Sequence, residues 1–183
     1  MRNVINLLPE EMDVAYVEAN PNMHRYNFER QDTYDAYNEL WNDAVAELTG
    51  RFVEYLNNNE DKIQDTYKAL RKKYGNKHAL KGWQWGPVNN TVYCGGGIKF
   101  VSCTGHGGFL VSHAREAGID AELQRGGTYE EDCDFMIVAA YYPDAAVKFN
   151  PDYFTDREHA RKVAAESVVR WSYGAVKNIL DRQ

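Results

Sequence analysis

The residue types best suited to chemistry lie in two short stretches, GHGGF at 105–109 and YEEDCDF at 129–135. In the first, His106 can accept or release a proton near neutral pH, as a general acid or base does. The glycines around it leave backbone N–H groups open to a closely approaching ligand or anion; they are Gly105, Gly107 and Gly108. The same pattern also suits a tight hairpin in which His106 is merely exposed.

The second stretch supplies four carboxylates. Thr128 and Glu131 have the spacing of a capping box, which predicts a helix from about residue 129 to residue 142, ended by Pro143. On such a helix Glu130 and Asp134 share a face, so their carboxylates could converge for acid–base work or on a hard metal ion. The alternative is that acids in a first helical turn only stabilise the positive end of the helix dipole.

Together these stretches define a predicted site. Its candidate catalytic residues are His106, Glu130, Glu131, Asp132 and Asp134, and its candidate ligand-binding residues are Gly105, Gly107, Gly108, Trp85 and Tyr129. Trp85 is either a buried packing residue or a stacking platform for a ligand. No metal site is predicted, because Cys103, His106, His113 and Cys133 lack the second close pair of a zinc site. A Cys103–His106 nucleophile pair is also disfavoured, because strand alternation and the turn separate the two side chains. The sequence identifies no cofactor.

The elements that must position this site indicate an α+β fold in one domain. Apolar residues recur every three or four positions over 32–57 and again over 63–74, which predicts two helices, most simply antiparallel, the second capped by Gly75. The segments 91–94, 98–103 and 109–113 predict a small antiparallel sheet, with TGHGG as a hairpin connection and a short helix after it. Thr155 and Glu158 predict the cap of one amphipathic helix of about 26 residues. The resulting division is a mainly helical part at 1–82, a motif-bearing core at 83–145 and a carboxy-terminal helix at 146–183.

Composition narrows the classes of protein. The 183 residues contain no apolar run of the about 18 residues that a membrane span needs, and the start lacks the pattern of a secretory signal. Three cysteines without a disulfide spacing predict free thiols and a cytoplasmic location, in the host cell if a phage encodes the protein. The net charge of −6 makes direct nucleic-acid binding an unfavoured function, and the basic stretch near residues 68–81 is interpreted as the solvated side of a helix.

Several motifs in a fixed order resemble a family of bacteriophage and plasmid proteins that share a domain of unknown function. The motifs are Trp85-Gly86-Pro87, the GHGGF stretch and the acidic stretch from Tyr129 to Asp134, and the resemblance spans roughly residues 83–145. This sequence departs from the family pattern at Cys103, where threonine is usual, and at Thr128, where tryptophan is usual. The resemblance implies a mobile-element origin and links the GHGG turn to the acidic stretch, but it implies no reaction, fold or cofactor.

Three functions follow from these observations as hypotheses. The first is a phage accessory protein whose acidic surface binds a host protein, such as a nucleic-acid-handling defence complex. The second is a hydrolase or group transferase that acts on a nucleotide or nucleic-acid component through His106 with Glu130 and Asp134. The third is a structural or morphogenetic phage component. The oligomeric state is left open.

Overall fold

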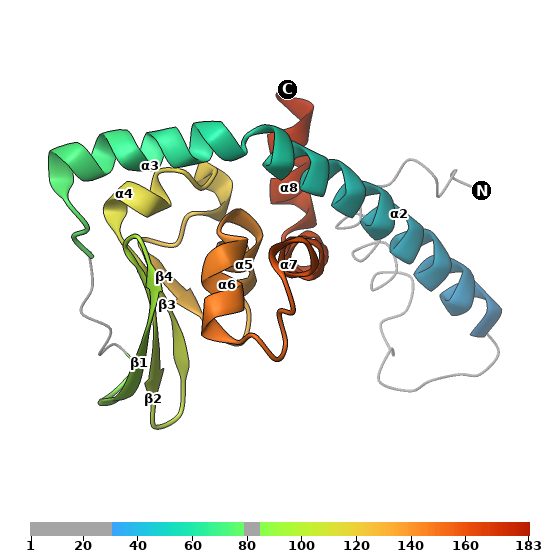
Figure 1. Cartoon of the computed structure of the whole chain (residues 1–183). Helices are drawn as coiled ribbons and strands as arrows, with labels where there is room; N and C mark the ends of the chain where they lie inside the picture. The colour runs from blue at the N-terminus through green and yellow to red at the C-terminus, as the bar shows by residue number, and fades with distance from the viewer. Residues whose placement is uncertain (1–30, 79–84) are drawn as a thin grey trace. The chain divides into compact units, whose positions relative to one another are not determined.

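The computed structural model describes residues 31–78 and 85–183. The chain divides into two compact units, residues 1–46 and 47–183. Of the first unit, the structure describes the beginning of helix α2, which runs over Gln31–Asn58. The second unit contains the rest of α2, all strands and all later helices, and Figure 1 shows the order of these elements along the chain. No helix among the described residues is long and apolar enough to cross a membrane.

The two predicted amino-terminal helices are present, but they do not form an antiparallel pair. Helix α3 (Glu60–Tyr74) follows α2 after the single residue Asn59. The Asn59 N–H donates to Tyr55 O at 3.0 Å, and the Ile63 N–H donates to Asn59 O at 2.9 Å, so helical hydrogen bonding continues across the junction. A reversal needs a loop that this junction lacks, and in Figure 1 α3 leads away from the end of α2. Gly75 ends α3 as predicted, with a φ of 70° and its N–H bonded to Arg71 O.

A four-stranded antiparallel sheet forms the core of the second unit. Its strands lie in the order β1 (Val88–Gly95), β2 (Ile98–Cys103), β3 (Gly107–Val111) and β4 (Thr128–Glu130). The first three strands match the predicted segments. Between β3 and β4 lie the short helix α4 (His113–Glu116), the 3-10 turn η3 (Ala121–Leu123) and a glycine loop, as the sequence indicates.

Helices cover one face of this sheet. Phe100 and Phe109, from β2 and β3, pack against Phe149 of α6 (Pro143–Phe149), with Phe100 stacked at a ring distance of 3.9 Å. Behind them α5 (Phe135–Tyr141) and α7 (Arg157–Trp171) pack together, and Figure 1 shows α5 and α6 between the sheet and α7. The predicted α+β class, with helices at both ends of the sequence around a small sheet, is therefore confirmed. The domain boundaries that we predicted remain a prediction.

The predicted capping box at Thr128 and Glu131 does not form. Thr128 to Glu130 is strand β4, in which Tyr129 lies opposite Phe109 and is fully buried. A turn follows, and α5 begins only at Phe135. Burying the Tyr129 ring beside the sheet outweighs the local capping preference, because tertiary packing contributes more free energy than one cap. Pro143 does not simply end a helix but begins α6.

The prediction of a single carboxy-terminal helix is also wrong, because this segment forms two helices, α7 and α8 (Tyr173–Asp181), that are separated at Ser172. Its cap is Asp156 rather than Thr155, since the Asp156 carboxylate accepts the His159 N–H at 2.9 Å. The predicted apolar face is partly confirmed. Its members Ala160, Ala164, Val168 and Ile179 are buried, whereas Trp171 is 76% exposed beside the break.

Candidate functional site

The turn between β2 and β3 carries His106. Strand β2 ends at Cys103 and β3 begins at Gly107, so the connection consists of Thr104, Gly105 and His106. The Cys103 N–H donates to the His106 carbonyl at 2.7 Å, which closes the hairpin. The predicted hairpin connection is confirmed, although Gly107 and Gly108 belong to the strand rather than to the turn. The imidazole of His106 projects from the end of the sheet with 53% of its side chain exposed.

Two of the motif glycines are required by close packing. A Cβ atom on Gly107 would lie 2.7 Å from the Val101 carbonyl oxygen, and one on Gly108 would lie 2.3 Å from the Tyr129 carbonyl oxygen. Both distances are shorter than real Cβ contacts, and neither glycine has a positive φ. Gly107 therefore lets β3 lie close to β2, and Gly108 lets β4 lie close to β3, whereas the position of Gly105 has open space around it.

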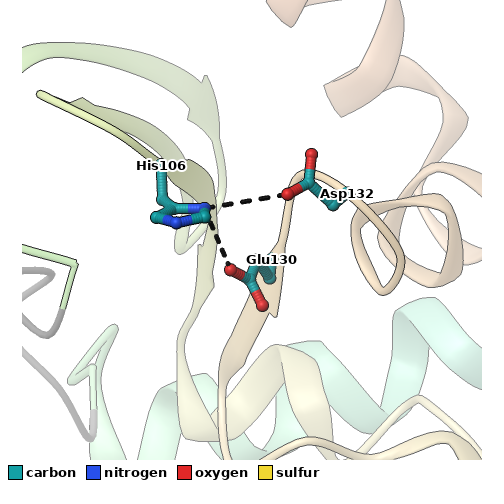
Figure 2. A group of neighbouring side chains, drawn as sticks. All are labelled: His106, Glu130 and Asp132. Carbon is teal, nitrogen blue, oxygen red and sulfur yellow. Dashed lines mark ion pairs between the residues drawn. The ribbon is translucent and has the colours of Figure 1, made fainter.

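Strand β4 brings the first acid to the histidine. Glu130 pairs with Gly108 in the register of β3 and β4. His106 Nδ1 lies 3.3 Å from Glu130 Oε1 and 3.7 Å from Asp132 Oδ2, as Figure 2 shows. The Glu130 side chain is 37% exposed and that of Asp132 is 73% exposed. The two predicted stretches therefore meet, and His106, Glu130 and Asp132 form what we call the imidazole–carboxylate cluster.

The other two acids lie elsewhere. Asp134 Oδ1 accepts a hydrogen bond from Arg125 Nε at 3.0 Å, so this carboxylate forms an ion pair with Arg125 rather than with His106. Glu131 directs its carboxylate toward Gly107, and its N–H donates to the Gly107 carbonyl. The predicted convergence of Glu130 and Asp134 on one helical face is wrong, because no helix forms over these residues. Their catalytic roles stay predictions.

A buried glutamate that the sequence analysis did not single out holds β4 in place. Glu116, 8% exposed, accepts hydrogen bonds at Oε1 from the Gly127 N–H at 2.6 Å, the Arg125 N–H at 3.1 Å and the Tyr129 hydroxyl at 3.2 Å. Burial, and then the nearby Glu116 carboxylate, raise the pKa of Tyr129. Tyr129 is fully buried beside Glu130 in β4, and its predicted contact with a ligand stays a prediction. The only sequence signal for Glu116 is an acid within a short helical segment between two motifs.

Trp85 lies beside the same strand pair. A Cβ atom on Gly108 would lie 2.7 Å from Trp85 Cη2 and 3.0 Å from Glu130 Cα, so the indole ring covers Gly108 next to Glu130. The residue is half-buried. Packing over a glycine explains this position, and the predicted contact of Trp85 with a ligand stays a prediction. Trp83, two residues earlier in the sequence, lies outside the described residues.

The cluster also has the composition of a divalent-cation site. One potential ligand atom from each of His106, Glu130 and Asp132 lies within 4.8 Å of the others. Among residues 31–78 and 85–183, no other group of three or more His, Cys, Asp or Glu residues has this spacing. Neither Cys103 nor Cys133 belongs to the cluster. All three cysteines are free thiols, as predicted. Burial, and then the charge of Asp134, raise the pKa of Cys133.

The fold and the cluster define an α+β domain with an exposed imidazole–carboxylate site at one end of a four-stranded antiparallel sheet. Residues 81–182, more than half of the chain, match the model of a family described as a domain of unknown function, DUF7007, and the chain belongs to this family. The match extends past residue 145, where our predicted resemblance ended, and includes α7 and α8. Comparison with curated proteins and with solved structures gave no match.

Proposed function

We propose that this domain is an enzyme in which His106 is the general acid–base group, acting as a hydrolase or group transferase on a nucleotide or nucleic-acid component. The observation that carries the proposal is the 3.3 Å separation of His106 Nδ1 and Glu130 Oε1, because an imidazole oriented by a carboxylate is a recurrent proton-transfer device. Twenty-four residues separate the two side chains in sequence, and the close approach of β4 to β3 at Gly108 brings them together.

In the proposed mechanism the two ring nitrogens have different roles. Nδ1 faces Glu130 and Asp132, so a proton on Nδ1 is directed to the carboxylates and Nε2 is free to take a proton from water or a substrate hydroxyl. The carboxylates then stabilise the imidazolium that forms. Because the cluster is exposed, solvent screens this effect to at most about 1 kcal/mol in the free protein. The open space beside Gly105 leaves room for a substrate next to the ring.

Replacing Glu130 with glutamine tests the orienting role. We expect kcat for hydrolysis of bis(p-nitrophenyl) phosphate to fall about tenfold with little change in KM, because the imidazole loses its charged partner but substrate binding is retained. The matched control is Glu131→Gln, whose carboxylate faces Gly107 and not His106, and it should keep the rate of the original protein. Equal losses in both variants, or a loss in KM alone, would contradict the assigned geometry.

A second candidate function is binding of a host protein by a phage or plasmid accessory protein. One observation favours it: Asp35, Glu39 and Asp43 recur every four residues along α2, and all three are exposed. Residues four apart lie on the same side of a helix, so they form an acidic stripe. A negative stripe fits a surface meant for phosphates, such as that of a nucleic-acid-handling complex.

Neutralising the acidic stripe tests this second candidate. We expect the chain to recover a basic partner from host lysate at low salt. The triple variant Asp35→Asn, Glu39→Gln, Asp43→Asn should recover at least tenfold less of this partner, because the attraction is ionic. The control variant neutralises exposed acids elsewhere, Asp61, Asp152 and Glu158. If the amount of partner recovered does not depend on salt concentration, or falls equally in the control variant, the acidic stripe is excluded as the binding surface.

A further inference from the structure

The carboxyl end of α3 and the segment after it carry a concentration of positive charge that the imidazole–carboxylate cluster does not use. Arg71, Lys72, Lys73 and Lys77 are exposed. None of them forms an ion pair with a carboxylate in the part of the chain that the structure describes, whereas Lys68, earlier on the same helix, pairs with Asp65 at 2.8 Å. Four cations within seven residues repel one another unless an anion lies among them, so this end of α3 is suited to an anionic partner.

The backbone ties the end of α3 to the sheet. The His113 N–H donates to Lys77 O at 3.1 Å, and His78 forms an antiparallel bridge with Ser112. The Ser112 N–H in turn donates to Gly97 O at 2.8 Å. Gly97 is two residues before Lys99 of β2, so Lys99 adds a fifth cation beside those of α3. We call Arg71, Lys72, Lys73, Lys77 and Lys99 the basic surface. Burial first, and then the charge of Lys99, lower the pKa of His78, in agreement with this placement.

Two exposed aromatic rings lie within the basic surface. Tyr74 is 42% exposed, and Lys73 Nζ lies 4.8 Å from its ring centre. Tyr93 of β1 is 72% exposed and lies directly opposite Lys99 in the strand register, so the two side chains share one face of the sheet. Exposed tyrosines among lysines offer flat surfaces on which nucleobases can stack while phosphates meet the cations.

We propose that the basic surface binds single-stranded nucleic acid, with phosphates on the lysines and bases stacked on Tyr74 and Tyr93. The overall negative charge of the chain does not prevent this, because salt screens charges beyond about 8 Å and the preceding acid on α3, Asp65, lies seven residues or about 10 Å before Lys72. The sequence favoured a solvated helix side for this stretch because Lys99 and Tyr93 are distant along the chain. The binding surface goes beyond the proposed catalytic function and does not depend on it.

Fluorescence anisotropy with the full chain tests the proposal, using a labelled oligothymidylate of about 12 nucleotides. We expect the logarithm of the association constant to fall linearly with the logarithm of the salt concentration, with a slope of about −2 to −3. Contact with three or four phosphates of a single strand gives this slope. The double variant Lys73→Glu, Lys99→Glu should weaken binding at least tenfold, and Tyr74→Ala about fivefold. The control double variant Lys148→Glu, Lys162→Glu reverses two exposed lysines elsewhere and should bind as the original protein does.

The outcomes separate this proposal from the catalytic one. His106→Ala should bind the oligonucleotide with unchanged affinity. A variant that loses catalysis but keeps this affinity would therefore still support the basic surface as the binding site. If Lys99→Glu unfolds the protein, the double variant Lys72→Glu, Lys73→Glu replaces it in the binding measurement, because both lysines are exposed at the end of α3. No binding at about 100 µM protein in low salt would overturn the proposal. So would equal competition by polyglutamate, or equal affinity for duplex DNA with no effect of Tyr74→Ala.

Discussion

Replacing His106 with alanine is expected to lower turnover of bis(p-nitrophenyl) phosphate by a factor of about 10²–10⁴, the usual contribution of a general acid–base group. The change removes the imidazole whose Nδ1 lies 3.3 Å from Glu130 Oε1 and leaves the two carboxylates without a proton-transfer partner. Because the His106 side chain is half-exposed in a turn, stability should change by no more than about 0.5 kcal/mol. A thermal melt of the variant therefore accompanies the rate measurement.

Two further measurements make this result decisive. His113→Ala, an exposed histidine at the start of α4, is the matched control and should keep the original rate. Chelation of divalent cations should also leave the rate unchanged, because the proposed mechanism uses His106 as an acid–base group. Activity that requires a divalent cation would instead make His106, Glu130 and Asp132 ligands of that cation. A His106→Ala variant with the original rate would exclude the site altogether.

Replacing Gly108 with alanine is expected to have the largest effect on stability, a loss of about 3 kcal/mol in the free energy of unfolding. The new Cβ atom would lie 2.3 Å from the Tyr129 carbonyl oxygen, and this backbone atom cannot rotate away as a side chain does. Relief of the contact must move β4 from β3 and so carry Glu130 away from His106. Both the urea midpoint and the catalytic rate should therefore fall.

Gly105→Ala is the matched control for this change. It lies in the same motif, but nothing is within 4 Å of its Cβ position and its φ is not positive, so its stability should stay within about 0.5 kcal/mol of the original. If Gly108→Ala unfolds at the same urea concentration as Gly105→Ala, the close approach of β4 to β3 is not what the GHGG motif provides.

Local patterns in the sequence predicted those features that neighbouring residues decide. The apolar periodicity over 32–57 and 63–74, the cap at Gly75 and the hairpin between β2 and β3 all depend on residues a few positions apart. Propensity and turn chemistry act over that range, so a single sequence is sufficient for them. The interruption between the two amino-terminal helices was predicted, but the absence of a reversal there and the break at Ser172 were missed, because each depends on how the flanking helices pack.

The sequence by itself determined the residues of the site but not their partners. It selected His106 and the four acids by type and by proximity to glycine, whereas only the tertiary structure decided that Glu130 and Asp132 face the imidazole and that Asp134 pairs with Arg125. The physical reason is the competition at Thr128 to Glu130. A capping box favoured a helix locally, but burial of Tyr129 against β3, with its hydroxyl on Glu116, requires a strand. Glu130 is the last residue of that strand and lies opposite Gly108, whereas Glu131 lies in the turn that follows, with its carboxylate toward Gly107.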